Sequence, residues 1–211
     1  MLKRREQEQE AIEGPEEVRK YAQQTKRFAR LMYGPMLKDI KRLGISGDCL
    51  EMGAGPGVLA AMLAESHPGV AITAVDLSAD MAAIAEEHIM QKGLPNRIRY
   101  IVADVQDTNA MLGLGKFDLV YSTFSLHHWK DPEASIANLW DMVKDNGMLY
   151  IYDFKRVWWL YVLPLKGGDI GSIRAAYTRK EIAAILQRLG IANYRVKTLF
   201  PFFLQSVTAW K

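Results

Sequence analysis

The sequence is poor in cysteine and has no long apolar run. A single cysteine, Cys49, among 211 residues excludes an intramolecular disulfide framework and any zinc or iron–sulfur site that needs several thiolates. The longest apolar run, Val157–Leu165, has nine residues, whereas a membrane-spanning helix needs about 20. No apolar stretch follows the basic first residues, which argues against a secretory signal or a transit peptide. We therefore expect a globular, cytoplasmic protein without a transmembrane segment.

Charge is distributed unevenly along the chain. Residues 43–150 hold 6 basic and 14 acidic side chains, whereas residues 19–42 hold 8 and 1 and residues 151–211 hold 10 and 3. This pattern of an acidic middle between basic flanks fits two interpretations. The charges either belong to solvated helix faces and edge strands, or the flanks meet an anionic substrate or surface.

The first 44 residues have a helical pattern. Apolar residues at three- and four-residue spacings predict an amphipathic helix over residues 16–33. Gly34-Pro35 interrupts the pattern, and Pro35 is well placed to begin a second short helix that ends near Gly44. We expect residues 1–44 to form a helical cap or lid over a domain of residues 45–211.

From Asp48 on, buried strands alternate with helices. The expected strands cover 49–52, 71–76, 98–104, 117–123 and 147–154, and the expected helices cover 58–65, 79–92 and 132–143. Strands that are nearly continuous apolar runs, separated by helices, indicate a parallel sheet covered on both faces. The fold class is therefore α/β.

The last third departs from this alternation. An irregular stretch is expected up to Tyr177. Thr178 with Glu181 three residues later is the capping-box pattern, which predicts a helix that runs to Leu189. Two final strands, near 194–200 and 203–210, are joined by a short connection and should form an antiparallel hairpin at one edge of the sheet.

A glycine-rich turn, Glu51–Gly57, follows the first strand and opens the next helix. Glycines there let the backbone turn sharply and approach a ligand, and the helix start presents unpaired N–H groups. Asp76, at the tip of the second strand, can accept hydrogen bonds from both hydroxyls of a ribose. A dinucleotide fingerprint needs glycine where this chain has Val58, so the G-x-G-x-G spacing favours another nucleoside cofactor.

With these motifs the sequence resembles the class I S-adenosylmethionine-dependent methyltransferases of the small-molecule type, over about residues 16–211. The resemblance implies a Rossmann-like, doubly wound sheet of seven strands with order 3-2-1-4-5-7-6, the last strand antiparallel, and an N-terminal helical cap. It implies S-adenosyl-L-methionine as the methyl donor and S-adenosyl-L-homocysteine as the product. The family's reaction is an in-line displacement at the methyl carbon.

The resemblance also assigns cofactor contacts to the first two strands. The glycine turn would pack against the methionine part of the cofactor, and Glu51 would help to hold its amino end. Asp76 would bind the ribose, and Leu77 would lie beside the adenine. The expected cofactor-binding residues of this part are Glu51, Gly53, Ala54, Gly55, Gly57, Asp76, Leu77 and Met81.

Two later motifs complete the implied cofactor site. After the third strand, Asp104 would accept a hydrogen bond from the adenine amino group, and the N–H of Val105 would donate to the ring. The stretch FDLVYSTFSLHHWKDP resembles the family's fourth-strand motif. Its tip, Ser122 and Thr123, and the following loop would close over the sulfonium and the substrate.

His127 and His128 are the candidate catalytic residues, because they lie near the expected methyl position and titrate near neutrality. Being adjacent, they cannot easily both face one pocket. Two interpretations stay open. Either one histidine is a general base or orients the substrate, or both histidines shape the loop. A base is needed only when the attacking atom carries a proton.

In this family the helices before the first strand and the segment after the fifth enclose the substrate, and here these are the two basic regions. The candidate substrate contacts are Tyr21, Tyr33, Trp129, Asp153, Arg174 and Tyr177. Core packing is the alternative for the aromatic residues, and backbone capping is the alternative for Asp153. An aromatic, basic cap suggests a substrate with an apolar body and, optionally, an anionic group. The run Val157–Leu165 could instead contact a membrane surface or a partner protein.

The sequence lacks the motifs of DNA methylation and of metal binding. Ser122–Ser125 stands where DNA amino-methylating enzymes of this fold carry a Pro-Pro-aromatic motif, and Cys49 is not on the loop where cytosine-carbon methylation needs a nucleophile. We therefore expect no DNA substrate, and no metal, since no ligand cluster at metal-binding spacing is evident. The leading interpretation is a small-molecule methyltransferase. The alternatives are a protein or RNA methyltransferase and a non-catalytic cofactor-binding subunit. The sequence does not indicate the acceptor atom or the oligomeric state.

Overall fold

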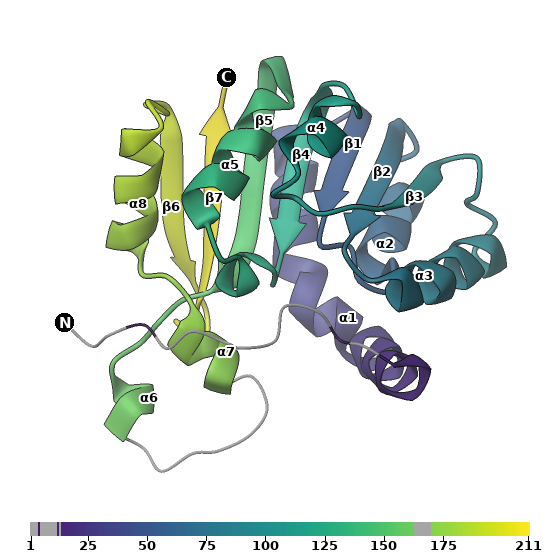
Figure 1. Ribbon diagram of the computed structural model, residues 1–211, viewed down its shortest axis with the longest axis horizontal. Coiled ribbons are helices and arrows are strands. Elements are labelled where there is room, and N and C mark those ends of the chain that lie inside the picture. Colours follow the sequence, from purple (N-terminus) through teal and green to yellow (C-terminus); the bar gives the residue numbers. More distant parts are fainter. Residues whose placement is uncertain (1–3, 5–11, 13, 163–169) are drawn as a thin grey trace.

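The computed structural model describes residues 4, 12, 14–162 and 170–211, so part of the predicted contact segment Val157–Leu165 lies outside the described residues. A seven-stranded sheet forms the centre, with strand order β3-β2-β1-β4-β5-β7-β6 (Figure 1). Its strands are β1 Gly47–Met52, β2 Val70–Asp76, β3 Ile98–Val102, β4 Phe117–Thr123, β5 Val143–Phe154, β6 Tyr194–Leu199 and β7 Leu204–Trp210. Only β7 runs antiparallel to its neighbours in this sheet. The predicted fold class and strand order are confirmed.

Helices cover both faces of the sheet (Figure 1). One face carries α1 Pro15–Leu43, α2 Val58–Ser66 and α3 Ala79–Gln91, and the other carries α4 Thr108–Leu112, α5 Pro132–Asp141 and α8 Arg179–Arg188. Successive strand residues face opposite sides: Leu119 and Tyr121 join the α1–α3 side of the core, whereas Val120 joins the other. Burial on both faces explains why the central strands β1, β4 and β5 are largely apolar.

Helix α1 corrects the expectation of two helices separated at Gly34-Pro35, because it is continuous from Pro15 to Leu43 with Pro35 in its interior. Proline inside a helix costs about 3 kcal/mol and removes the hydrogen bond to the carbonyl four residues earlier. That carbonyl belongs to Leu31, whose side chain is 78% exposed, so water can reach this side of the helix. Met36 and Ile40 continue the fully buried stripe beyond the proline, and this packing against the sheet outweighs the local break.

The ends of two strands differ from the sequence expectation. β3 stops at Val102 instead of 104, which places Asp104 and Val105 in the following loop. β5 begins at Val143, four residues early, because the β4–β5 pairing contains an irregularity in which Asn146 takes a left-handed φ of 68°. Polar residues in such a bulge hide the strand from a pattern-based prediction.

The region after β5 holds short helices where the sequence indicated irregular structure. These are α6 Trp159–Val162 and α7 Ile170–Ala175; the 3-10 turn η1 Leu126–His128 follows β4. The capping box is confirmed, since Thr178 and Glu181 exchange both expected hydrogen bonds at the start of α8. The C-terminal hairpin is also confirmed, with β6 at the sheet edge. Within the described ranges, no helix has the length and apolar character needed to cross a membrane.

Candidate functional site

The glycine turn after β1 needs glycine for both conformation and space. Gly53, Gly55 and Gly57 have φ values of 73°, 52° and 67°, which side chains strongly disfavour. A Cβ atom on Gly53 would lie 2.5 Å from Ser125 Oγ, and one on Gly57 would lie 3.1 Å from Ala85 Cβ. The N–H of Gly53 donates to the carbonyl of Val75 at 2.8 Å, which ties the turn to the end of β2. The spacing G-x-G-x-G therefore follows from this packing.

A cavity opens where the carboxyl ends of β1, β2 and β3 meet the loop after β4. Its lining residues are Met52, Gly53, Asp76, Leu77, Ala103, Asp104, Val105, Gln106, Ser125, His128 and Trp129. The structure thus brings together the glycine turn, both predicted aspartates and one predicted histidine, although they are far apart in the sequence.

Asp76 is held in place at the cavity wall by the backbone. Its Oδ2 accepts from the N–H of Gly55 at 2.8 Å, and its Oδ1 accepts from the N–H of Ser78 at 3.0 Å. Burial raises the pKa of Asp76, and these N–H groups partly offset that rise. Each carboxylate oxygen has two lone pairs, so the fixed carboxylate can still accept hydrogen bonds from a ligand's hydroxyls.

The adenine side of the expected site is lined by Leu77 and by the loop after β3. The Leu77 side chain is 45% exposed, which is a high exposure for leucine and leaves an apolar surface for a ring. Asp104 is exposed and accepts from the N–H of Gln106 at 2.8 Å, an arrangement that fixes the loop beside Val105. Both predicted loop residues line the cavity.

Glu51 lies beneath the cavity and does not line it. The side chain is 1% exposed and accepts a hydrogen bond from the Tyr121 hydroxyl at 3.0 Å. Burial raises the pKa of Glu51 to about 8, the Tyr121 hydrogen bond opposes this rise, and the Asp76 charge adds to it. A cation placed nearby would favour the ionised form, so Glu51 is suited to interact with a positively charged ligand end.

Other residues that were predicted to bind the cofactor are buried near the cavity and do not line it. The buried Met81 receives the Ser78 side-chain cap on its N–H. Ser122 is fully buried beside Met52 in the β1–β4 register, and its Oγ has no hydrogen-bond partner in the described part of the chain. The residues expected to bind cofactor that lie outside the cavity lining are Glu51, Ala54, Gly55, Gly57, Met81, Ser122 and Thr123.

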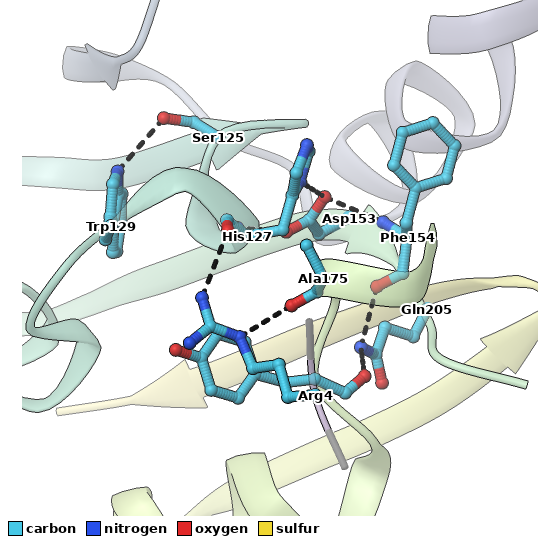
Figure 2. Close-up of polar contacts among 9 residues, drawn as sticks. Arg4, Ser125, His127, Trp129, Asp153, Phe154, Ala175 and Gln205 are labelled. Carbon is cyan, nitrogen blue, oxygen red and sulfur yellow. Dashed lines mark hydrogen bonds and ion pairs between the residues drawn. The ribbon is translucent and has the colours of Figure 1, made fainter. Parts of the chain in front are cut away.

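The rings of the two histidines pack against each other, with their centres 4.1 Å apart. His128 lines the cavity. His127 faces Asp153 at the end of β5, with its Nδ1 at 2.7 Å from Asp153 Oδ1 (Figure 2). Both side chains of this pair are 2% exposed. An ionised carboxylate can only accept, so Nδ1 is the donor of this hydrogen bond.

Asp153 accepts two further hydrogen bonds, one from the η1 turn and one from the end of β5. Its Oδ2 accepts from the N–H of His127 at 3.0 Å, and its Oδ1 accepts from the N–H of Phe154 at 2.7 Å (Figure 2). Asp153 therefore fixes the turn that presents His128. This position supports the capping interpretation of Asp153 rather than direct substrate binding.

Arg4 adds a contact that the sequence did not indicate. Its guanidinium donates to the carbonyls of Ala175 at 2.6 Å and His127 at 3.2 Å (Figure 2). The same group lies 4.5 Å from the centre of the Tyr177 ring. Gln205 donates to the carbonyls of both Phe154 and Tyr177. These bonds join the segment before α8 to the end of β5.

The remaining substrate candidates divide between two places. On α1, Tyr21 lies next to the glycine turn, 3.9 Å from where a Cβ of Gly55 would be, and Tyr33 packs against Phe124 with ring centres 6.2 Å apart. Arg174 instead donates to the carbonyl of Leu160 at 2.7 Å and braces α6 against α7. Trp129 lines the cavity and donates to Ser125 Oγ at 3.0 Å.

An aromatic cluster beside η1 was not predicted as a unit. Phe124 directly follows β4 with a left-handed φ of 50°, which is a strained conformation for a bulky side chain. Its ring lies 5.2 Å from that of Tyr152 and 4.9 Å from that of Phe154. No sequence signal distinguishes this phenylalanine from a core residue. Residues 14–162 and 170–211, with Arg4 and Ile12, hold no group of three or more histidine, cysteine, aspartate or glutamate side chains arranged to bind a metal.

Comparison with known proteins agrees with this geometry. Residues 50–149 match the family model described as a methyltransferase domain. The chain is 30% identical over 143 residues to the demethylmenaquinone methyltransferase of Thermus thermophilus, covering 61% of each protein. It is 28% identical over 123 residues to the ubiquinone biosynthesis O-methyltransferase of Haemophilus ducreyi, covering 57% of this chain and 50% of that protein. The matched segments span a quarter to about three fifths of the length of the first curated relatives.

Solved structures share the fold. A SAM-dependent methyltransferase from Aquifex aeolicus superposes with a TM-score of 0.73 at 20% identity, covering 94% of this chain and 99% of that one. The strand order, the domain match over residues 50–149 and the cavity at the glycine turn agree with each other. Residues 50–149 thus match a methyltransferase domain, and the chain shares the fold of the SAM-dependent methyltransferase from Aquifex aeolicus.

Proposed function

We propose that this protein transfers a methyl group from S-adenosyl-L-methionine to a small molecule. The observation that carries the proposal is the single cavity that joins Gly53, Asp76 and Asp104 to His128. When bound, the cofactor supplies an electrophilic methyl group on a sulfonium. Asp76 would hold the ribose, Leu77 and Val105 would contact the adenine, and the buried Glu51 would favour the cationic methionine end.

The proposed substrate has an apolar, aromatic body. Two of the relatives are named for methylating intermediates of menaquinone and ubiquinone. The aromatic cluster of Tyr33, Phe124 and Phe154 beside η1 supports a similar kind of substrate here. An anionic group on the substrate stays part of the proposal because of the basic flanks.

We assign the catalytic role to His128 and a positioning role to His127. His128 lines the cavity, where its ring can accept the proton of a substrate hydroxyl. His128 would hold the substrate hydroxyl and accept its proton while the bound cofactor supplies the methyl group to the oxygen. His127 acts through its bond to Asp153, which holds η1.

Turnover with a panel of phenols, quinols and aromatic acids tests the proposal. His128→Ala should lower kcat by about 10²- to 10⁴-fold, the usual contribution of a general base, and abolish the fall of kcat at acidic pH. His67→Ala, at the end of α2, is the matched control and should leave kcat unchanged. S-adenosylhomocysteine binding without turnover on any substrate would favour a non-catalytic cofactor-binding subunit instead.

The positioning role of His127 has a separate readout. His127→Ala should lower both kcat and thermal stability, because Asp153 loses its side-chain donor while buried. His127→Asn can still donate to Asp153 and should restore most of both. A pH profile that shifts in His127→Asn while His128→Ala keeps the wild-type profile would reverse the two roles.

A further inference from the structure

Four large apolar side chains lie exposed on one end of the molecule. Trp158 directly precedes α6 and is 70% exposed, and Val162, the last residue of α6, is 71% exposed. Phe200 and Phe202 on the β6–β7 turn are 79% and 64% exposed. Single exposed apolar residues are common on proteins, but a group of them at one place marks an interaction surface. We name this surface, together with the lysines and arginines beside it, the basic–aromatic face.

Trp158 and Phe202 line one groove, which joins the start of α6 to the β6–β7 turn. The groove is lined by Lys155, Arg156, Val157, Trp158, Trp159, Thr178, Arg179, Lys180 and Phe202. Phe200 extends it, because its ring centre is 5.8 Å from that of Phe202. Figure 1 shows α6, the β6–β7 turn and the start of α8 at the same end of the sheet.

Positive charge dominates the lining of the groove. Four of its lining residues are cations, namely Lys155, Arg156, Arg179 and Lys180. Arg156 forms an ion pair with Glu181. Burial and the nearby Arg179 lower the pKa of Lys155, as expected where cations gather. The face therefore complements an anionic partner that also accepts aromatic side chains.

We propose that the basic–aromatic face docks onto an anionic lipid membrane. Tryptophan and phenylalanine favour the boundary between headgroups and acyl chains, and lysine and arginine contact acidic headgroups. The four exposed apolar side chains belong to two short segments, and the groove between Trp158 and Phe202 is also lined by Lys155, Arg179 and Lys180, which suits insertion into a lipid surface. An acidic protein would complement the positive charge of the face. Its binding would not explain the two exposed phenylalanines on the β6–β7 turn, whereas insertion into a lipid surface does.

The position of the face relative to the catalytic site supports this inference. The segment that forms the face continues directly from Asp153 and Phe154 at the end of β5, and the cavity opens at the same end of the sheet. Docking would hold the site next to the lipid, where apolar substrates dissolve. The inference does not require methyl transfer, because membrane binding is measured without turnover.

Co-sedimentation of the full chain with vesicles tests the proposal. Vesicles of phosphatidylcholine with about one third phosphatidylglycerol should bind the protein, whereas pure phosphatidylcholine vesicles should bind it much less. Binding should weaken when salt is raised from about 0.1 M to about 1 M, because the screening length falls from ~10 Å to ~3 Å.

Three variants define the surface. Phe200→Ser with Phe202→Ser, and separately Trp158→Ser, should each weaken binding to the anionic vesicles by about tenfold or more, since each removes large inserted apolar side chains. Leu112→Ser is the matched control, because Leu112 is 58% exposed on α4 at the opposite end of the sheet (Figure 1). Unchanged affinity for S-adenosylhomocysteine in each variant shows that the fold is intact.

Three results would overturn the proposal. These are no binding to either vesicle, equal binding to both vesicle types, and undiminished binding of the phenylalanine and tryptophan variants. Self-association that disappears in the phenylalanine variant, without vesicle binding, would assign the face to a second copy of the chain.

Discussion

Asp76 has two roles: it lines the cavity, and it holds the glycine turn by hydrogen bonds to the backbone. The sequence predicts a ribose-binding carboxylate at the end of β2, and the structure places Asp76 in the cavity wall. The same carboxylate also accepts from the N–H groups of Gly55 and Ser78. A substitution there therefore alters the glycine turn as well as the expected ligand contact.

Replacement of Asp76 separates these two functions. Asp76→Ala should weaken S-adenosylhomocysteine binding by about 1 to 3 kcal/mol through lost hydrogen bonds to the ribose. Asp76→Asn keeps one acceptor oxygen for the backbone and should fold normally while losing part of the affinity. Calorimetric titration measures both, and wild-type affinity in Asp76→Ala would contradict the ribose assignment.

The buried Glu51 predicts a pH-dependent stability. Its pKa is about 8 in the folded protein against an ordinary value of 4.5, so the unfolded chain releases the proton at lower pH than the folded one. The free energy of unfolding should therefore fall as pH rises from about 5 to 8 and then level off. Glu51→Gln lacks this proton and should gain roughly 2 to 5 kcal/mol relative to wild type over that range.

Urea unfolding of wild type and Glu51→Gln at several pH values between 5 and 9 measures this difference. Gln keeps an acceptor for the Tyr121 hydroxyl, so the comparison isolates the charge. Parallel pH curves for the two proteins would show that Glu51 is ionised in the folded state.

Some site residues carry no local signal. Arg4 stands among charged residues near the start of the sequence, and only the tertiary fold shows that it bonds to His127 and Ala175. Phe124 and Ser125 lie inside the motif that the sequence singled out, but their roles depend on a left-handed backbone and on the close approach of Gly53. Long-range packing of this kind leaves no periodic trace in a sequence.

At the scale of elements, the pattern of apolar runs and helices predicted nearly the whole sheet, because the central strands are buried on both faces. The errors came where tertiary packing competes with local preference. α1 continues through Pro35 since its buried stripe continues on both sides. β5 starts early at a polar bulge, and the short α4, α6 and α7 are too brief to give a helical period.

The packing of the turn between β1 and α2 against α3 can be tested by substitution. Gly57→Ala should destabilise the protein by more than the about 1 to 2 kcal/mol that a left-handed alanine costs, since its Cβ would also press on Ala85. Gly93→Ala is the matched control, because Gly93 has a φ of 69° and nothing within 4 Å. Thermal denaturation compares them, and equal losses would show that the contact between the turn and α3 is loose.

At the scale of the whole molecule, the cavity, the two histidines and the basic–aromatic face all lie at one end of the sheet. The carboxyl ends of β1, β2 and β3 form the cavity, η1 beside the end of β5 carries the histidines, and the basic–aromatic face adjoins them. Parallel strands place their carboxyl ends together, and ligands of open α/β sheets bind there. This arrangement follows from the strand order, which the sequence resemblance predicted correctly.

Calorimetric titration of the wild-type protein with S-adenosylhomocysteine, repeated in the presence of excess NAD, tests the central assignment most directly. We expect one binding site per chain for S-adenosylhomocysteine, with an affinity that NAD does not change. Absence of binding heat, or displacement of S-adenosylhomocysteine by NAD, would contradict the assignment of the cavity to a sulfonium nucleoside.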